Sequence, residues 1–356
     1  MSLPDQLCIN PNPDIAGIGV RVSIYTQAFL TFIPALFFFR DGTITDYESG
    51  TLRATFINTL LTACALLLSA FIQIKTYGLS VYHTIIVLNL SWINNANAVA
   101  CIILVKTEMD RKRARDQLRG LAPKLPDEET RLGWLGLRSE TGRPHWPAIL
   151  AVAHLCVMAG LGIWLWSNVR VFGPWDQLDC TPQTFMTVLG YDLLVIRNNI
   201  RIISLVLYSL TVIPVMNIRL FHFFVDFNVM LLSILYFAIT KLLVGANLIR
   251  PILDEEKQKK TARYEFHLLV AAIIVILFMV DTEAMIRRSA NMVKSGESQW
   301  TFGQTLAMFM VVIPLSDCLK QGYEAYKRKK KTKAMRIPWP VWNKDFRGGN
   351  VNGGMV

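Results

Sequence analysis

A row of polar side chains runs through one long apolar stretch of the chain, residues 81–105. At about 100° per residue, one face of a helix over this stretch carries His83, Ser91, Asn94, Asn97 and Cys101. The stretch is long enough to cross a bilayer, but an unpaired amide in hydrocarbon is energetically costly. We therefore predict a helix inside a bundle, with its polar face turned toward partners or water.

Five ionisable side chains lie in a segment of two apolar runs, residues 200–247, and three of them are candidates for a site: His222, Asp226 and Lys241. His222 and Asp226 are four positions apart, so on a helix they share a face and can form a pH-sensitive pair. Alternatively, His222 lies in a turn at headgroup level and Asp226 caps the next helix. Lys241 lies in a nearly all-apolar run, where it either serves a function or extends its stem to the interface. These three complete the candidate ligand-binding or pore-lining set, with His83, Ser91, Asn94 and Asn97.

Cysteine placement identifies one disulfide candidate. Four of the six cysteines lie within or at the end of apolar runs, where a thiol usually behaves as a small hydrophobic group. Cys8 and Cys180 lie in polar segments instead. If both segments face an oxidising compartment, a bridge between them is allowed.

Common enzyme signatures do not occur in the sequence. It has no glycine-rich phosphate loop, no Cys-x-x-Cys, no His-Glu-x-x-His and no Gly-x-Ser-x-Gly. The acidic clusters at 127–129 and 254–256 lie in basic polar segments rather than at helix ends that face a core. These patterns favour a protein that is not an enzyme and that holds no metal and no cofactor.

Composition places the chain in a membrane. Of its 356 residues, 53% are hydrophobic and 18% are charged, whereas soluble domains average about 25% charged. The net charge of +11 gathers in two segments, because 20 of the 37 Lys and Arg residues lie in 106–146 and 320–356. That clustering is typical of cytoplasmic charge beside membrane helices, where anionic lipid headgroups are a possible partner. It does not indicate nucleic-acid binding, for which no motif is present.

The apolar runs predict an all-α, polytopic transmembrane helix bundle with eight runs and seven net crossings. An exterior segment, 1–21, precedes the first three helices in 22–105, and a basic cytoplasmic loop follows at 106–146. Helices four to seven lie in 147–319, with an ambiguous pair at 200–247, and a basic cytoplasmic tail follows at 320–356. With the N-terminus exterior or lumenal, 27 basic residues lie inside and seven outside. This orientation fits the plasma membrane or a secretory-pathway membrane.

Three motifs resemble those of a family of uncharacterised fungal multi-pass integral membrane proteins. They are NPDIAGIGVRVSIY at 12–25, LNLSWI at 88–93 and WTFGQTLAMF at 300–309. The first is the most distinctive, and the order and spacing match across most of the chain. The resemblance implies a fungal integral membrane protein with an exterior N-terminus. It brings no reaction, ligand or catalytic residue.

Three classes of function fit these patterns. The favoured one is a membrane protein that passes or senses a small solute through a polar intramembrane site, as a transporter, channel or receptor-like protein. A structural or scaffolding protein is the first alternative, because Asn side chains also join helices within bundles. The second is an intramembrane enzyme acting on a lipid or isoprenoid, for which Asp226, Asp281 and Glu283 would have to converge on one cavity.

Overall fold

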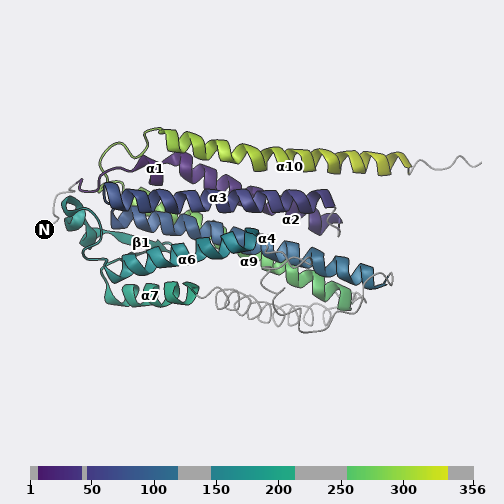
Figure 1. Cartoon of the computed structure of the whole chain (residues 1–356), viewed down its shortest axis with the longest axis horizontal. Coiled ribbons are helices and arrows are strands. Elements are labelled where there is room, and N and C mark those ends of the chain that lie inside the picture. The colour runs from purple at the N-terminus through teal and green to yellow at the C-terminus, as the bar shows by residue number, and fades with distance from the viewer. Residues whose placement is uncertain (1–6, 42–45, 119–145, 213–254, 336–356) are drawn as a thin grey trace, which may run out of the picture.

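In the described part of the chain, six long helices run along a common axis and form an elongated bundle (Figure 1). The computed structural model describes residues 7–41, 46–118, 146–212 and 255–335. Its elements are α1 (Pro13–Ala16), α2 (Ile18–Asp41), α3 (Asp46–Thr76), α4 (Val81–Leu118), α6 (Trp146–Ser167), a 3₁₀ helix η1 (Trp175–Gln183), β1 (Phe185–Val188), β2 (Tyr191–Leu194), α7 (Asn198–Val212), α9 (Glu255–Arg288) and α10 (Phe302–Met335). This is the predicted all-α architecture, with one short antiparallel hairpin, β1–β2, added.

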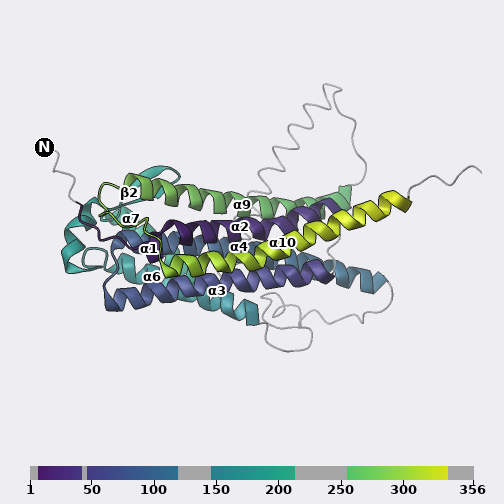
Figure 2. The same ribbon diagram turned by 90° about the horizontal axis from the view of Figure 1, so that it is seen from above.

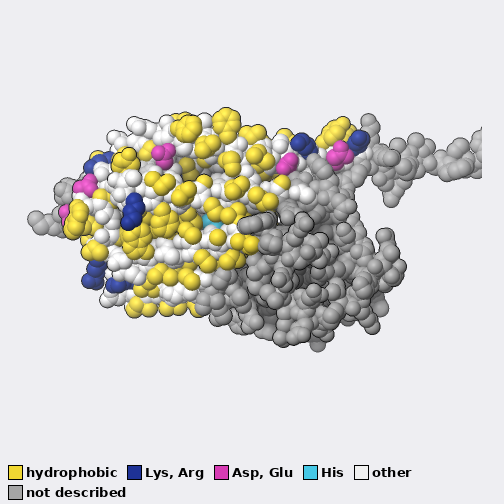
Figure 3. All heavy atoms as spheres, in the orientation of Figure 1, with side chains coloured by type: hydrophobic (Ala, Val, Ile, Leu, Met, Phe, Trp, Pro, Cys, Tyr) yellow, Lys and Arg dark blue, Asp and Glu magenta, His cyan; other side chains and the backbone are white. Residues whose placement is uncertain are grey.

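Five stretches among the described residues are long and apolar enough to cross a bilayer: Pro13–Ile33, Ala54–Thr76, Ile149–Ser167, Leu269–Arg288 and Phe302–Glu324. Hydrophobic side chains cover much of the described flank of the bundle (Figure 3). The protein is therefore a multi-pass membrane protein. The seven-crossing topology stays a prediction, because most of the ambiguous pair at 200–247 lies outside the described residues.

α4 lies at the centre of the bundle (Figure 2). The helices α2, α3, α6 and α9 all pack against it. Every residue from 79 to 91 and from 93 to 98 is buried. The predicted polar face is thus enclosed by protein.

Two helices extend well beyond the apolar runs that the sequence delimits. α4 continues past residue 105 to Leu118, and α10 continues past residue 319 to Met335. The added residues are rich in Lys, Arg, Glu and Gln, which have high helix propensity. Hydropathy predicts where an apolar run ends, but it does not predict the helix end, because polar residues with high helix propensity continue the helix. At the other end of the bundle, α2 begins at Ile18, ahead of the predicted start at 22.

Close packing between α6 and α7 depends on one glycine. A Cβ atom on Gly162 would lie 2.5 Å from a ring carbon of Tyr208. The Tyr208 hydroxyl accepts a hydrogen bond from the Trp92 indole N–H at 3.2 Å, so the ring is also tied to α4. A Cβ atom on Gly160, two positions earlier, would meet no atom within 4 Å. Gly162 therefore sets how closely α7 approaches the bundle.

We predict that Gly162→Ala destabilises the protein, because the added methyl group must displace the Tyr208 ring. Overpacking of this kind typically costs about 1–3 kcal/mol. The measurement is the thermal unfolding midpoint of the purified protein in detergent. Gly160→Ala is the matched control and should leave the midpoint unchanged or raise it, because Ala favours a helix over Gly. Equal midpoints for the two variants would contradict this packing.

Candidate functional site

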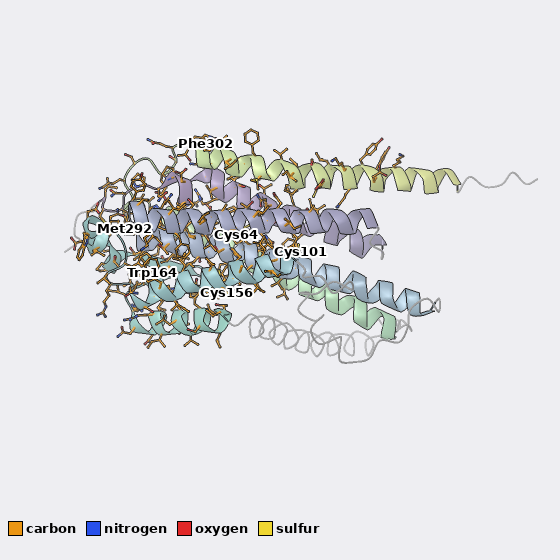
Figure 4. All side chains as sticks on the ribbon, in the orientation of Figure 1. Cys64, Cys101, Cys156, Trp164, Met292 and Phe302 are labelled. Atoms are coloured by element: carbon orange, nitrogen blue, oxygen red, sulfur yellow. A yellow bond between two sulfur atoms is a disulfide. The ribbon has the colours of Figure 1, made fainter. Side chains whose placement is uncertain are left out.

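A disulfide joins Cys8 to Cys180, the two cysteines that the sequence singled out, with their Cα atoms 6.0 Å apart. We call this end of the bundle the disulfide end. Met292 and Trp164 also lie there (Figure 4). The bond connects the segment before α1 to η1, two parts of the chain separated by 172 positions.

Backbone hydrogen bonds fasten the same N-terminal segment to the connection between α9 and α10. Ile9 N donates to the carbonyl of Met292 at 2.9 Å, and Lys294 N donates to the carbonyl of Ile9 at 2.9 Å. Asn10 extends the contact to η1, because its backbone N–H donates to Gln177 Oε1 at 3.3 Å. Three separate loops thereby form one cap over the disulfide end.

Two of the three motifs of the sequence analysis contact each other in this cap. Gly19 N donates to Gln304 Oε1 at 2.9 Å, which ties the start of α2 to the start of α10. A Cβ atom on Gly19 would lie 2.7 Å from Gln304 Cβ. Gly17 is similarly crowded by Gln304 and by the Pro13 carbonyl. The glycines of the first motif therefore permit the close approach of a side chain from the third.

A cavity of about 320 Å³, partly open to solvent, lies at the disulfide end. That volume is at the small end of the range for small-molecule sites. Polar groups from the N-terminal segment, the corner between α3 and α4, and η1 line most of it. They include Asn10, Asn12, Asp14, Gln73, Ser80, His83 and Gln177. Tyr77, which is 85% exposed, also lines the cavity and adds an aromatic surface.

His83 is held in the cavity wall by hydrogen bonds on both ring nitrogens. Its Nδ1 lies 2.8 Å from Ser80 Oγ, and its Nε2 lies 3.2 Å from Glu297 Oε1. A neutral imidazole satisfies both contacts when Nε2–H donates to Glu297 and the Ser80 hydroxyl donates to Nδ1. Ser80 Oγ also accepts the backbone N–H of His83 at 3.3 Å, as an N-cap residue does. The first turn of α4 and the imidazole thus share one network.

Serine, histidine and a carboxylate are also the residue types of nucleophilic hydrolases. In this protein the Ser80 side chain is buried, and its oxygen accepts the amide that begins α4. Glu297 has a second structural role, because its Oε2 accepts the backbone N–H of Asn12 at 3.3 Å. The arrangement is therefore a structural hydrogen-bond network, in which both ring nitrogens of His83 have partners and Ser80 is committed to the start of α4.

The remaining predicted groups of α4 lie deeper in the bundle than His83. Ser91, Asn94 and Asn97 are each 0% exposed. Asn94 and Asn97 lie about 17 and 21 Å below His83 along the helix axis. Among the residues that the structure describes, neither amide has a hydrogen-bond partner at its oxygen or its nitrogen, and the Ser91 hydroxyl has none either. The structure therefore brings His83 to the cavity and leaves three unpartnered polar groups inside the bundle.

The other three candidate residues, His222, Asp226 and Lys241, lie outside the described residues.

Further buried polar groups surround α4 that the sequence analysis did not select. His154 of α6 contacts Asn95 of α4, with Nδ1 3.0 Å from Oδ1, and its Nε2 has no partner. Gln27 of α2 and Thr55 and Thr59 of α3 are buried and have unpartnered oxygens. The spacing of the two threonines, four positions apart on an apolar helix, was a detectable signal, because it places both on one face.

Of the three carboxylates considered for an intramembrane enzyme, the two that the structure describes, Asp281 and Glu283, have different partners. Glu283 pairs with Arg21 and accepts the Tyr25 hydroxyl at 2.9 Å. Asp281 accepts two backbone N–H groups of the β1–β2 hairpin. They do not converge on one cavity. Across the residues for which side chains are described, no cluster of three or more His, Cys, Asp or Glu side chains is placed to hold a metal ion.

No family model, curated protein or solved structure matches the chain. The resemblance of the three motifs to fungal multi-pass membrane proteins therefore stays a prediction.

We predict that removing the disulfide loosens the cap and weakens any solute binding in the cavity. Asn10 and Gln177 line the cavity, and each lies close in sequence to one bridged cysteine. Cys8→Ser combined with Cys180→Ser should lower the free energy of unfolding by about 2 kcal/mol or more. Thermal unfolding with and without a reductant measures this. Cys64→Ser is the control, because Cys64 is a free cysteine in α3 and far from the cap. A double variant as stable as the parent would contradict a structural role for the bridge.

Proposed function

We propose that this protein binds a small polar solute in the cavity at the disulfide end and senses it or passes it across the membrane. The observation that carries the proposal is the position of His83. It lines the cavity in the first turn of the same helix that carries the unpartnered amides of Asn94 and Asn97. A buried amide without a partner is costly, so a solute or water that bonds these groups would be stabilised there.

We also propose that the disulfide end faces the exterior or the lumen. Disulfides persist in oxidising compartments, which supports this orientation. The extensions of α4 and α10 supply a second argument, because their basic residues lie toward the opposite end of the bundle (Figure 1). Positive charge concentrates on the cytoplasmic side of membrane proteins.

Sensing is favoured over an open channel. The cavity lies at the disulfide end, whereas Ser91, Asn94 and Asn97 below it are fully enclosed by neighbouring helices. Passage of a solute along α4 would therefore require the helices around it to move apart. A receptor-like protein needs only that a bound solute change the contacts of the first turn of α4.

A scaffolding role is the second candidate, and Asn95 is the residue that favours it. Its amide joins α4 to α6, because Oδ1 contacts His154 and Nδ2 donates to the sulfur of Met158 at 3.0 Å. This is the way in which Asn side chains join helices in membranes. Within the described part of the chain, Asn94 and Asn97 make no such contact. Substitutions of Asn95, which joins two helices, and of Asn97, which does not, therefore distinguish a scaffolding function from solute binding.

We predict that Asn95→Leu and Asn97→Leu have opposite effects. Asn95→Leu leaves His154 unpaired and should cost about 1–3 kcal/mol of stability. Asn97→Leu replaces an unpartnered amide by an apolar side chain of similar size, so stability should stay equal or rise. Solute-dependent activity should be lost in Asn97→Leu. Thermal unfolding of the two variants, together with the assays below, measures both effects.

Two assays test for a solute. Thermal unfolding of the purified protein is recorded with a panel of sugars, amino acids, amines and inorganic ions, because a ligand at 100 times its Kd stabilises the native state by about 2.7 kcal/mol. Flux of the same panel is measured in proteoliposomes. Gln73→Leu should abolish a stabilising effect, because Gln73 lines the cavity. Gln183→Leu is the control, because Gln183 is an exposed residue of the same cap.

The outcomes separate the candidate functions. Stabilisation without flux identifies a sensor, and flux that Asn97→Leu removes identifies a transport protein. If no member of the panel stabilises the protein or crosses the membrane, and Asn97→Leu folds normally, the scaffolding function replaces our proposal.

A further inference from the structure

The β1–β2 hairpin carries an apolar tip. Its strands pair with Val188 opposite Tyr191, so a two-residue turn, Leu189–Gly190, connects them. Val188, Leu189 and Tyr191 are 38%, 64% and 76% exposed. These three side chains form a small apolar surface at the end of the hairpin.

Leu189 occupies a backbone conformation that leucine seldom adopts. Its φ is +51° and that of Gly190 is +82°, the pattern of a type I′ turn. Asn, Asp or Gly normally fills the first of these positions, because a side chain larger than these is sterically disfavoured at positive φ. The sequence keeps an apolar side chain at the tip in spite of this disfavoured conformation.

Side chains of α9 satisfy the backbone polar groups of the turn. Asp281 accepts Leu189 N–H at 2.8 Å through Oδ2 and Gly190 N–H at 2.9 Å through Oδ1. Arg288 Nη1 donates to the Gly190 carbonyl at 2.9 Å and to Asp192 Oδ1 at 2.6 Å. Backbone groups bonded within the protein in this way lose little on leaving water, which is the condition for entering a lipid phase.

The turn lies beside a membrane span rather than beyond its end. Asp281 falls within the stretch Leu269–Arg288, seven positions before its last residue, or about 10 Å along the helix. Exposed apolar side chains of α9, among them Leu277 and Val280, lie on the same span. In Figure 2, β2 lies alongside the part of α9 nearest the disulfide end. The apolar tip is thus held against a membrane span that itself exposes apolar side chains.

We propose that the tip of this hairpin, residues 188–191, enters the lipid leaflet at the disulfide end. Val188 and Leu189 contact the upper part of the acyl chains, and Tyr191 lies at the level of the glycerol groups, where Tyr is enriched. The charged pair of Arg288 and Asp192 lies at headgroup level on the face of the hairpin toward α9. The leaflet, rather than another protein, is the partner, because the tip is held against a membrane span that itself exposes apolar side chains.

Fluorescence quenching in lipid nanodiscs tests this proposal. An environment-sensitive dye is attached to Tyr191→Cys in a background in which Cys64, Cys101, Cys156 and Cys318 are replaced by Ser. The matched control is Trp175→Cys, because Trp175 of η1 is 89% exposed. Phosphatidylcholine with a nitroxide on carbon 5 of the acyl chain should quench the Tyr191→Cys dye at least twofold more than the control dye. Aqueous iodide should show the opposite order.

Two further variants keep the test decisive. Val188→Cys provides a second probe position and should give the same order of quenching. Leu189→Asn introduces a residue that tolerates positive φ and removes the apolar group, so it should reduce lipid quenching of the Tyr191→Cys dye by half or more. Quenching of the tip by iodide as strongly as the control would overturn the proposal. Shielding of the tip from both quenchers would also overturn it and would indicate a protein partner.

Discussion

The polar side chains that α4 places inside the bundle are shielded from water, and each of them is costly to bury unless it finds a hydrogen-bond partner. Asn95 recovers a partner in His154 of α6. His83 recovers two, in Ser80 and Glu297. Asn94 and Asn97 recover none among the described residues. Because α2, α3, α6 and α9 all pack against α4, these two amides lie at the centre of the bundle.

The cap at the disulfide end and the first turn of α4 line one polar cavity. The cap brings together the segment before α1, the 3₁₀ helix η1 and the connection before α10, which are far apart in the sequence. The close contact of Gly19 with Gln304 joins the start of α2 to the start of α10 at this end. Every group that lines the cavity therefore depends on contacts between distant parts of the chain.

Carboxylates near the ends of the membrane spans serve structural roles. Glu283 balances the charge of Arg21 at the start of α2, and Asp281 binds the turn of the hairpin. Both residues belong to α9, which therefore positions two different parts of the disulfide end. Charged groups at membrane depth often mark function, but here a specific partner accounts for each of these two.

The sequence by itself determined the membrane class, the helical architecture and the polar face of α4, because these follow from local hydropathy and helical periodicity. It also singled out Cys8 and Cys180, since only these two cysteines lie in polar segments. Only the tertiary structure decided which polar groups have partners. Asn94, Asn95 and Asn97 look alike in the sequence, yet only Asn95 points toward a histidine. The cavity was also beyond the sequence, because its lining residues come from segments that only folding brings together.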